Sequence, residues 1–156
     1  MKKAINIYQI FTRLFANTNE TNKEFGTLEE NGCTKFNDIS TEALKALRNF
    51  GTTHVWYTGI IRHASCSNYE QFGLKANNPF AIKGRAGSPY AITDYYDVCP
   101  DFAEKVENRM KEFELLLLRT HNCGLKCIID FVPNHVAREY CSEKIPENCT
   151  DLGADD

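Results

Sequence analysis

The sequence predicts an α/β fold with a parallel sheet, in the order strand, helix, strand, helix, strand. Residues 4–11, 54–61 and 125–132 predict strands because they are short, apolar and rich in β-branched and aromatic residues. Residues 40–50 and 101–123 separate them and carry apolar residues at helical spacing. Such alternation implies parallel strands with right-handed crossovers, so both a doubly wound sheet and the opening of a (β/α)8 barrel fit the pattern.

The segment after the first strand predicts a loop and then a helix. Residues 17–38 are polar and contain several asparagines and two glycines, a composition typical of loops. Ser40 is the expected N-cap of the first helix, and Ile39 and Leu44 have the spacing of a hydrophobic staple around it. Gly51 is expected to end this helix.

The second strand leads into the longest segment without a periodic pattern. Residues 62–100 contain three glycines, three prolines and many aromatic residues, so we expect an irregular loop there. A loop of that length within a compact domain usually has a function.

The second helix is expected from residue 101 to residue 123. Asp101 is the predicted N-cap, and Glu104 stands at the third helical position as in a capping box. Four apolar residues step along one predicted face, namely Val106, Met110, Phe113 and Leu117.

The third strand brings the polar residues of greatest interest. Its nearly continuous apolar run predicts burial on both faces, and Asp130 interrupts that run. A buried carboxylate requires a partner, although a carboxylate that caps the next turn is an equally good interpretation of Asp130 alone. Asn134 and His135 follow at the carboxyl end of the strand, where parallel α/β folds build their sites.

Composition excludes several classes of function. The 156 residues carry a net charge of −3, with pI about 5.8, which argues against a dedicated nucleic-acid-binding protein. No stretch approaches the roughly 18 consecutive apolar residues of a membrane helix, and no glycine-rich nucleotide motif occurs. Seven cysteines without a C-x-x-C pair are typical of free thiols in a reducing compartment, so we expect a cytoplasmic protein.

Three motifs in order give the chain a resemblance to a known family. Residues 130–135 (DFVPNH) resemble the D-x-x-x-N-H signature of the α-amylase family, glycoside hydrolase family 13. Residues 7–11 (IYQIF) are similar to the family's first strand, and residues 89–96 (PYAITDYY) to its G-Y-x-x-x-D-Y segment. The resemblance implies the amino-terminal part of a (β/α)8 TIM barrel over residues 1–136, which is incomplete, and the start of an inserted domain over residues 137–156.

The resemblance also implies a role for each motif residue. Tyr90 resembles the tyrosine that stacks on the sugar at the cleavage point, and His135 the histidine that hydrogen-bonds the same sugar. Asp130 resembles an aspartate that supports an arginine beside the nucleophile, and Asp94 is expected to support the site structurally. Asn134 matches a position that supplies oxygen to calcium in many members, so calcium is the one cofactor expected.

By resemblance, the function is retaining hydrolysis of α-glucans such as starch or maltooligosaccharides. The family's aspartate nucleophile and glutamate acid/base follow later strands, so no catalytic residue is expected in this chain. Ser88 and Pro89 depart from the family pattern, which indicates a substrate preference of its own. The alternative is a non-catalytic carbohydrate-binding or interaction module. The expected partner is an α-glucan, with no nucleic acid and no membrane.

Overall fold

The computed structural model describes residues 4–152 and 154. Its helices and strands are β1 (Ile7–Phe11), α1 (Leu28–Asn31), α2 (Thr41–Asn49), β2 (His54–Thr58), β3 (Ile61–His63), β4 (Ile92–Val98), α3 (Arg109–Asn122) and β5 (Lys126–Ile129). Five short 3-10 turns, at Phe36–Asp38, Glu70–Phe72, Pro79–Ala81, Pro100–Phe102 and Val106–Asn108, lie between them. No helix in this described part of the chain is long and apolar enough to cross a membrane.

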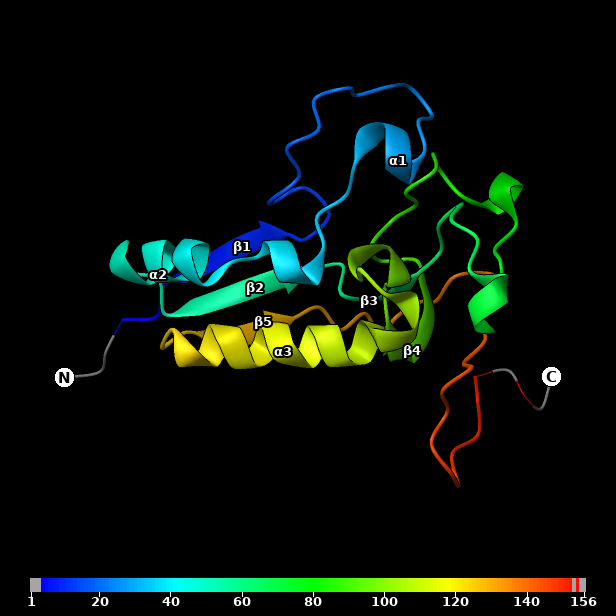
Figure 1. Ribbon diagram of the computed structural model, residues 1–156. Helices are drawn as coiled ribbons and strands as arrows, with labels where there is room; N and C mark the ends of the chain where they lie inside the picture. Colours follow the sequence, from blue (N-terminus) through cyan, green and yellow to red (C-terminus); the bar gives the residue numbers. More distant parts are fainter. Residues whose placement is uncertain (1–3, 153, 155–156) are drawn as a thin grey trace.

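The predicted parallel sheet is confirmed. Its strand order is β1-β2-β5, and both pairings are parallel. The helices α2 and α3 connect these strands and lie on the same face of the sheet (Figure 1). The order β1-α2-β2-α3-β5 is therefore the β-α-β-α-β unit that the sequence predicts.

The core lies between this sheet and the two helices. Ile10, Val55 and Tyr57 point from the strands toward the helices and are almost completely buried. Leu44 of α2 and Leu116 of α3 meet them from the other side. Each such side chain contributes about 1.5–3 kcal/mol when it is fully buried, so this cluster supplies much of the stability of the unit.

The opposite face of the sheet is open, and the prediction that the third strand is buried on both faces is wrong. On that face Ile7 and Phe11 of β1 are 54% and 42% exposed, and no residue of β5 is fully buried. Strand β5 is an edge strand of the described sheet and is only four residues long. Because β5 is a short edge strand, with a strand on one side only, its side chains stay exposed or half-buried.

The N-cap of α2 is as predicted, whereas the start of α3 is not. Ser40 Oγ accepts the backbone N–H of Ala43, as an N-cap does. Helix α3 begins at Arg109, eight residues after Asp101, and two 3-10 turns precede it. Asp101 does not cap a helix because its carboxylate is bound by Arg13, which follows β1.

Two further details of α3 differ from the sequence prediction. The backbone N–H groups of Glu104 and Lys105 donate to the carboxylate of Glu112 inside α3, which holds the entering segment against the first turns. Met110 is 41% exposed, although Val106 and Phe113 are buried as expected. The buried face therefore runs through Phe113 and Leu116, and Met110 lies at its border.

Residues 62–100 are not wholly irregular. Strand β3 pairs with β4 in an antiparallel ladder, and the register is irregular at Arg62. Asp97 at the end of β4 binds Arg109 of α3 through two parallel hydrogen bonds, Nε to Oδ1 (2.8 Å) and an NH2 nitrogen to Oδ2 (2.6 Å). This buried ion pair attaches the β3–β4 ladder to the helix, which local sequence does not reveal.

Candidate functional site at the carboxyl end of the parallel sheet

Asp130 lies directly after β5 and is held by two donors from the end of β2. The indole N–H of Trp56 donates to Asp130 Oδ1 (2.7 Å), and the backbone N–H of Gly59 donates to Oδ2 (3.3 Å). The carboxylate therefore has two neutral donors and is half-buried. Arg13 and Arg62 bind other carboxylates, so neither of these two arginines is its partner.

Asn134 and His135 lie in the turn after β5, on a cleft of about 700 Å³. Both side chains are exposed. The turn is anchored by Tyr95 of β4, whose hydroxyl donates to the carbonyl oxygens of Val132 and His135. The structure thus brings two of the predicted site residues to one opening.

Aromatic rings and polar groups share the walls of this cleft. The ring of Tyr95 is 5.7 Å from that of Phe131 and 5.7 Å from that of Tyr140, measured between centroids. Phe131 and Tyr96 leave much of their rings exposed. Aromatic faces beside amide, imidazole and carboxylate groups are the combination that suits a pyranose, whose faces are apolar and whose edge carries hydroxyls.

Tyr90 lies apart from that cleft and is not among the residues that line it. Its neighbour Pro89 packs on Gly59, where a side-chain Cβ would come within 3.0 Å of the proline ring. Gly59 also has a φ of +84°, so glycine is required on both grounds. Pro89 and Gly59 line a second hollow of about 240 Å³, together with Phe11 at the end of β1.

Asp94 is completely buried in β4 and faces neither opening. Its carboxylate accepts the backbone N–H groups of Tyr96 (2.8 Å) and Glu143 (3.0 Å). Burial raises the pKa of Asp94, and these hydrogen bonds oppose the rise. Glu143 also forms an ion pair with Arg62, so Asp94 helps to fasten the segment after β5 onto the β3–β4 ladder.

The described residues give a limited donor set for calcium. No three His, Cys, Asp or Glu side chains gather in residues 4–152 and 154 in a way that would hold a metal ion. Asn134 shares its cleft with Asp151, and Asp151 Oδ1 is buried without a hydrogen-bond partner in that part of the chain. Calcium takes six to eight oxygens, so these two side chains would provide only part of a site.

Sequence reasoning missed Trp56, Gly59 and Tyr95, the residues that position Asp130 and His135. Trp56 belongs to a strand that was expected, but its pairing with Asp130 depends on sheet register, which no local pattern encodes. Gly59 carries a usable signal, because an isolated glycine beside a strand often marks a close backbone approach.

The comparison with known proteins supports one family. The model of the alpha amylase catalytic domain matches residues 9–148. Maltase A1 of Drosophila melanogaster is 28% identical over 134 residues, which are 86% of this chain and 17% of that protein. The amino acid transporter heavy chain SLC3A1 of Homo sapiens is 39% identical over 51 residues, which are 33% of this chain and 7% of that protein.

Solved structures share the fold. The maltogenic alpha-amylase AmyB from Thermotoga neapolitana superposes with a TM-score of 0.56 at 23% identity, over 87% of this chain and 24% of that one. The debranching enzyme of Nostoc punctiforme gives 0.55 at 22% identity, over 87% and 25%. This chain spans less than a fifth of the maltase and about a quarter of these two structures. The chain belongs to the alpha-amylase family, glycoside hydrolase family 13, and its β-α-β-α-β unit is part of that family's barrel.

Proposed function

We propose that this protein is a glycoside hydrolase that acts on α-glucans, and that residues 4–152 form part of its substrate-binding surface. The observation that carries the proposal is the arrangement at the carboxyl end of the sheet. There Trp56 and Gly59 donate hydrogen bonds to Asp130 and so fix the position at which the next turn begins. That turn places Asn134 and His135 on the cleft. Relatives named as a maltase and an alpha-glucosidase point to the same substrate class.

Tyr90 and His135 are the proposed contacts to sugar. Tyr90 is 39% exposed, and an exposed tyrosine ring is suited to stacking on the apolar face of a pyranose. His135 is exposed, and either ring nitrogen can donate to or accept from a sugar hydroxyl. A hydrogen bond that strengthens as positive charge develops on the sugar would favour the transition state over the bound substrate.

A retaining mechanism requires two carboxyl groups about 5–5.5 Å apart. The strand aspartates of this segment have structural partners instead: Asp97 binds Arg109, Asp94 accepts backbone amides, and Asp130 accepts from Trp56. We therefore propose that the nucleophile and the acid/base belong to other strands of the whole barrel, as the family resemblance implies.

Calcium and location are also proposals. Asn134 and Asp151 would provide two of the oxygens of a calcium ion, with backbone carbonyls or water completing the shell. The ion would stiffen the segment after β5 and would take no part in the chemical step.

The proposed location is the cytoplasm. All seven cysteines are free thiols, which supports a reducing compartment.

The test uses the protein expressed from its complete gene, with maltooligosaccharides as substrates. We expect Tyr90→Ala and His135→Ala to lower kcat/KM at least tenfold while thermal stability is retained. Phe80→Ala is the matched aromatic control, because Phe80 is 98% exposed, and His121→Ala is the matched histidine control on α3. Unchanged kcat/KM in both site variants would refute the assigned roles.

A second candidate is a non-catalytic interaction module. It is favoured by the similarity to SLC3A1, a protein named as a transporter heavy chain rather than as a hydrolase. The same preparation separates the two functions. Turnover of maltooligosaccharides supports the enzyme, whereas absence of turnover together with saturable sugar or protein binding supports the module.

A further inference from the structure

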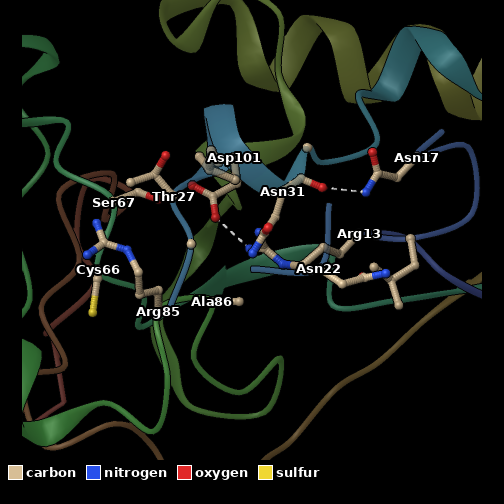
Figure 2. Close-up of a pocket in the computed structure, with 14 residues that line it drawn as sticks. Arg13, Asn17, Asn22, Thr27, Asn31, Cys66, Ser67, Arg85, Ala86 and Asp101 are labelled. Carbon is tan, nitrogen blue, oxygen red and sulfur yellow. Dashed lines mark hydrogen bonds and ion pairs between the residues drawn. The ribbon is translucent and has the colours of Figure 1, made fainter. Parts of the chain in front are cut away.

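A cavity outside the cleft of Asn134 and His135 combines two arginines with amide and hydroxyl groups. It has a volume of about 220 Å³ and lies between the segment after β1, helix α1 and the irregular part of residues 64–91 (Figure 2). Its polar lining includes Arg13, Asn22, Ser67, Arg85 and Asp101. It shares no lining residue with that cleft.

The ion pair between Arg13 and Asp101 forms the base of the cavity. Their closest atoms are 2.5 Å apart, and the two side chains are 12% and 1% exposed. The other carboxylate oxygen of Asp101 accepts the hydroxyl of Tyr69 (2.9 Å). Burial by itself would raise the pKa of Asp101, but the charge of Arg13 and these hydrogen bonds lower it below the usual value. Asp101 therefore stays ionised with both oxygens engaged.

Arg13 keeps donors that these contacts do not use. A guanidinium has five N–H groups. Arg13 directs one nitrogen to Asp101 and another to Cys33 Sγ (3.7 Å), and its guanidinium carbon Cζ lies over the Phe102 ring, 5.4 Å from the ring centre. Packing thus fixes the guanidinium at the base of the cavity with N–H groups to spare.

Arg85 brings a second positive charge to the wall. Figure 2 shows its side chain directed toward Ser67 and Thr27, on the other side of the cavity from Arg13 in this view. Arg85 takes part in none of the four ion pairs of the described residues. The charged residues of the lining are Arg13, Arg85 and Asp101, so the net charge of the lining is positive.

The chemistry of the lining selects the ligand class. No aromatic side chain lines the cavity, so it lacks the stacking surface that a sugar ring prefers. Charge-assisted donors in a concave site favour an oxyanion, since arginine binds phosphate and carboxylate in a matching planar geometry. The volume lies below the roughly 300–1,000 Å³ of drug-sized pockets, which suits a small anionic group.

We propose that this cavity is a binding site for an oxyanion, either a phosphate or a carboxylate group, held by Arg13 at the base and Arg85 at the wall. Neither Tyr90 nor His135, the proposed sugar contacts, lines this cavity, although Arg13 also lines the neighbouring hollow at Pro89 and Gly59. The same anionic group can come from inorganic phosphate, from a phosphorylated sugar or from a free carboxylate. Titration with each compound shows which of them the cavity binds.

The experiment is isothermal titration of the protein expressed from its complete gene with phosphate, glucose 6-phosphate, citrate and neutral glucose. We expect one of the three anions to bind, with an affinity that falls as salt is added. Arg85→Ala should weaken that binding about tenfold or more at unchanged thermal stability, because Arg85 is exposed. Lys83→Ala, which removes an exposed charge outside the lining, should leave binding unchanged.

Three results would overturn the proposal. The first is the absence of binding by all three anions to the folded protein. The second is equal loss of binding in Arg85→Ala and Lys83→Ala, because general surface charge would then be responsible. The third is binding of neutral glucose that depends on Arg85, which would make the cavity a sugar site instead.

Discussion

The indole N–H of Trp56 donates to Asp130 Oδ1 over 2.7 Å and joins the carboxyl ends of β2 and β5. The two residues are 74 positions apart, and the bond spans neighbouring strands of the sheet. Asp130 also receives the N–H of Gly59, so one carboxylate fixes both the exit of β2 and the exit of β5. The turn with His135 follows β5 directly, and Gly59 after β2 lies against Pro89.

Trp56→Phe should remove this hydrogen bond and keep a ring in place. We expect a loss of about 1–3 kcal/mol in the free energy of unfolding, because the half-buried carboxylate loses a donor. Urea denaturation measures it. In the Asp130→Ala variant, Trp56→Phe should lower the free energy of unfolding clearly less, because the hydrogen bond is already absent. An equal cost in both backgrounds would mean that Trp56 stabilises the protein through packing alone.

The Asp97–Arg109 pair should be among the most sensitive contacts in the chain. Its side chains are 0% and 6% exposed, so Arg109→Met leaves a buried carboxylate without a counter-charge. We expect a loss of about 3–5 kcal/mol, and a smaller loss in the double variant Asp97→Leu/Arg109→Met.

The matched control for that pair is the exposed ion pair of Lys23 and Glu30, whose side chains are 57% and 38% exposed. Lys23→Met should change the stability by less than about 1 kcal/mol because water screens both charges. A similar loss for the buried and exposed pairs would contradict the assigned importance of burial.

Stability should fall as the pH falls below about 6.5, through His63. Burial lowers the pKa of His63, and the hydrogen bond with the Ile61 carbonyl only partly opposes this. The unfolded chain therefore binds a proton before the folded one does. The stability from a neutral His63 is complete above pH 6.5 and is lost toward the lower folded pKa.

The check is thermal denaturation from pH 7.5 to pH 5. His63→Gln should flatten the profile in that interval relative to the unsubstituted protein. His121→Gln, at an exposed histidine of α3, should not. If the profile of His63→Gln keeps its full slope, another group is responsible.

The cysteines should differ strongly in reactivity. Cys149 is exposed, whereas Cys99 is buried, and burial raises the pKa of its thiol well above the usual value. Since the thiolate is the reactive form, alkylation at pH 8 should reach Cys149 within minutes and Cys99 only after unfolding. Mass spectrometry of the alkylated peptides measures this order. Stable disulfides in thiol-trapped extracts would contradict the cytoplasmic proposal.

Removal of calcium tests the proposal for Asn134 and Asp151. A chelator should lower the Tm of the protein expressed from its complete gene by several degrees, and added calcium should restore it. Asp151→Asn should reduce the response. An unchanged Tm in the unsubstituted protein with and without chelator would exclude a calcium ion that stabilises this segment.

The sequence alone determined the β-α-β-α-β order of the parallel unit, the cap of α2 at Ser40 and the motif that carries Asp130, Asn134 and His135, but not α1, β3 or β4. These features are local: helical periodicity, capping groups and apolar runs are written within a few neighbouring residues. The family resemblance also rests on short motifs of neighbouring residues. The sequence was therefore enough to predict the family correctly.

Tertiary structure decided the features that depend on distant partners. Asp101 has the sequence of a helix cap, yet it binds Arg13, which is 88 positions away, so α3 begins at Arg109. Likewise, β4 is a strand because β3 pairs with it. A buried carboxylate such as Asp101 needs a partner that replaces its lost hydration, and which partner is near is fixed only when the chain has folded.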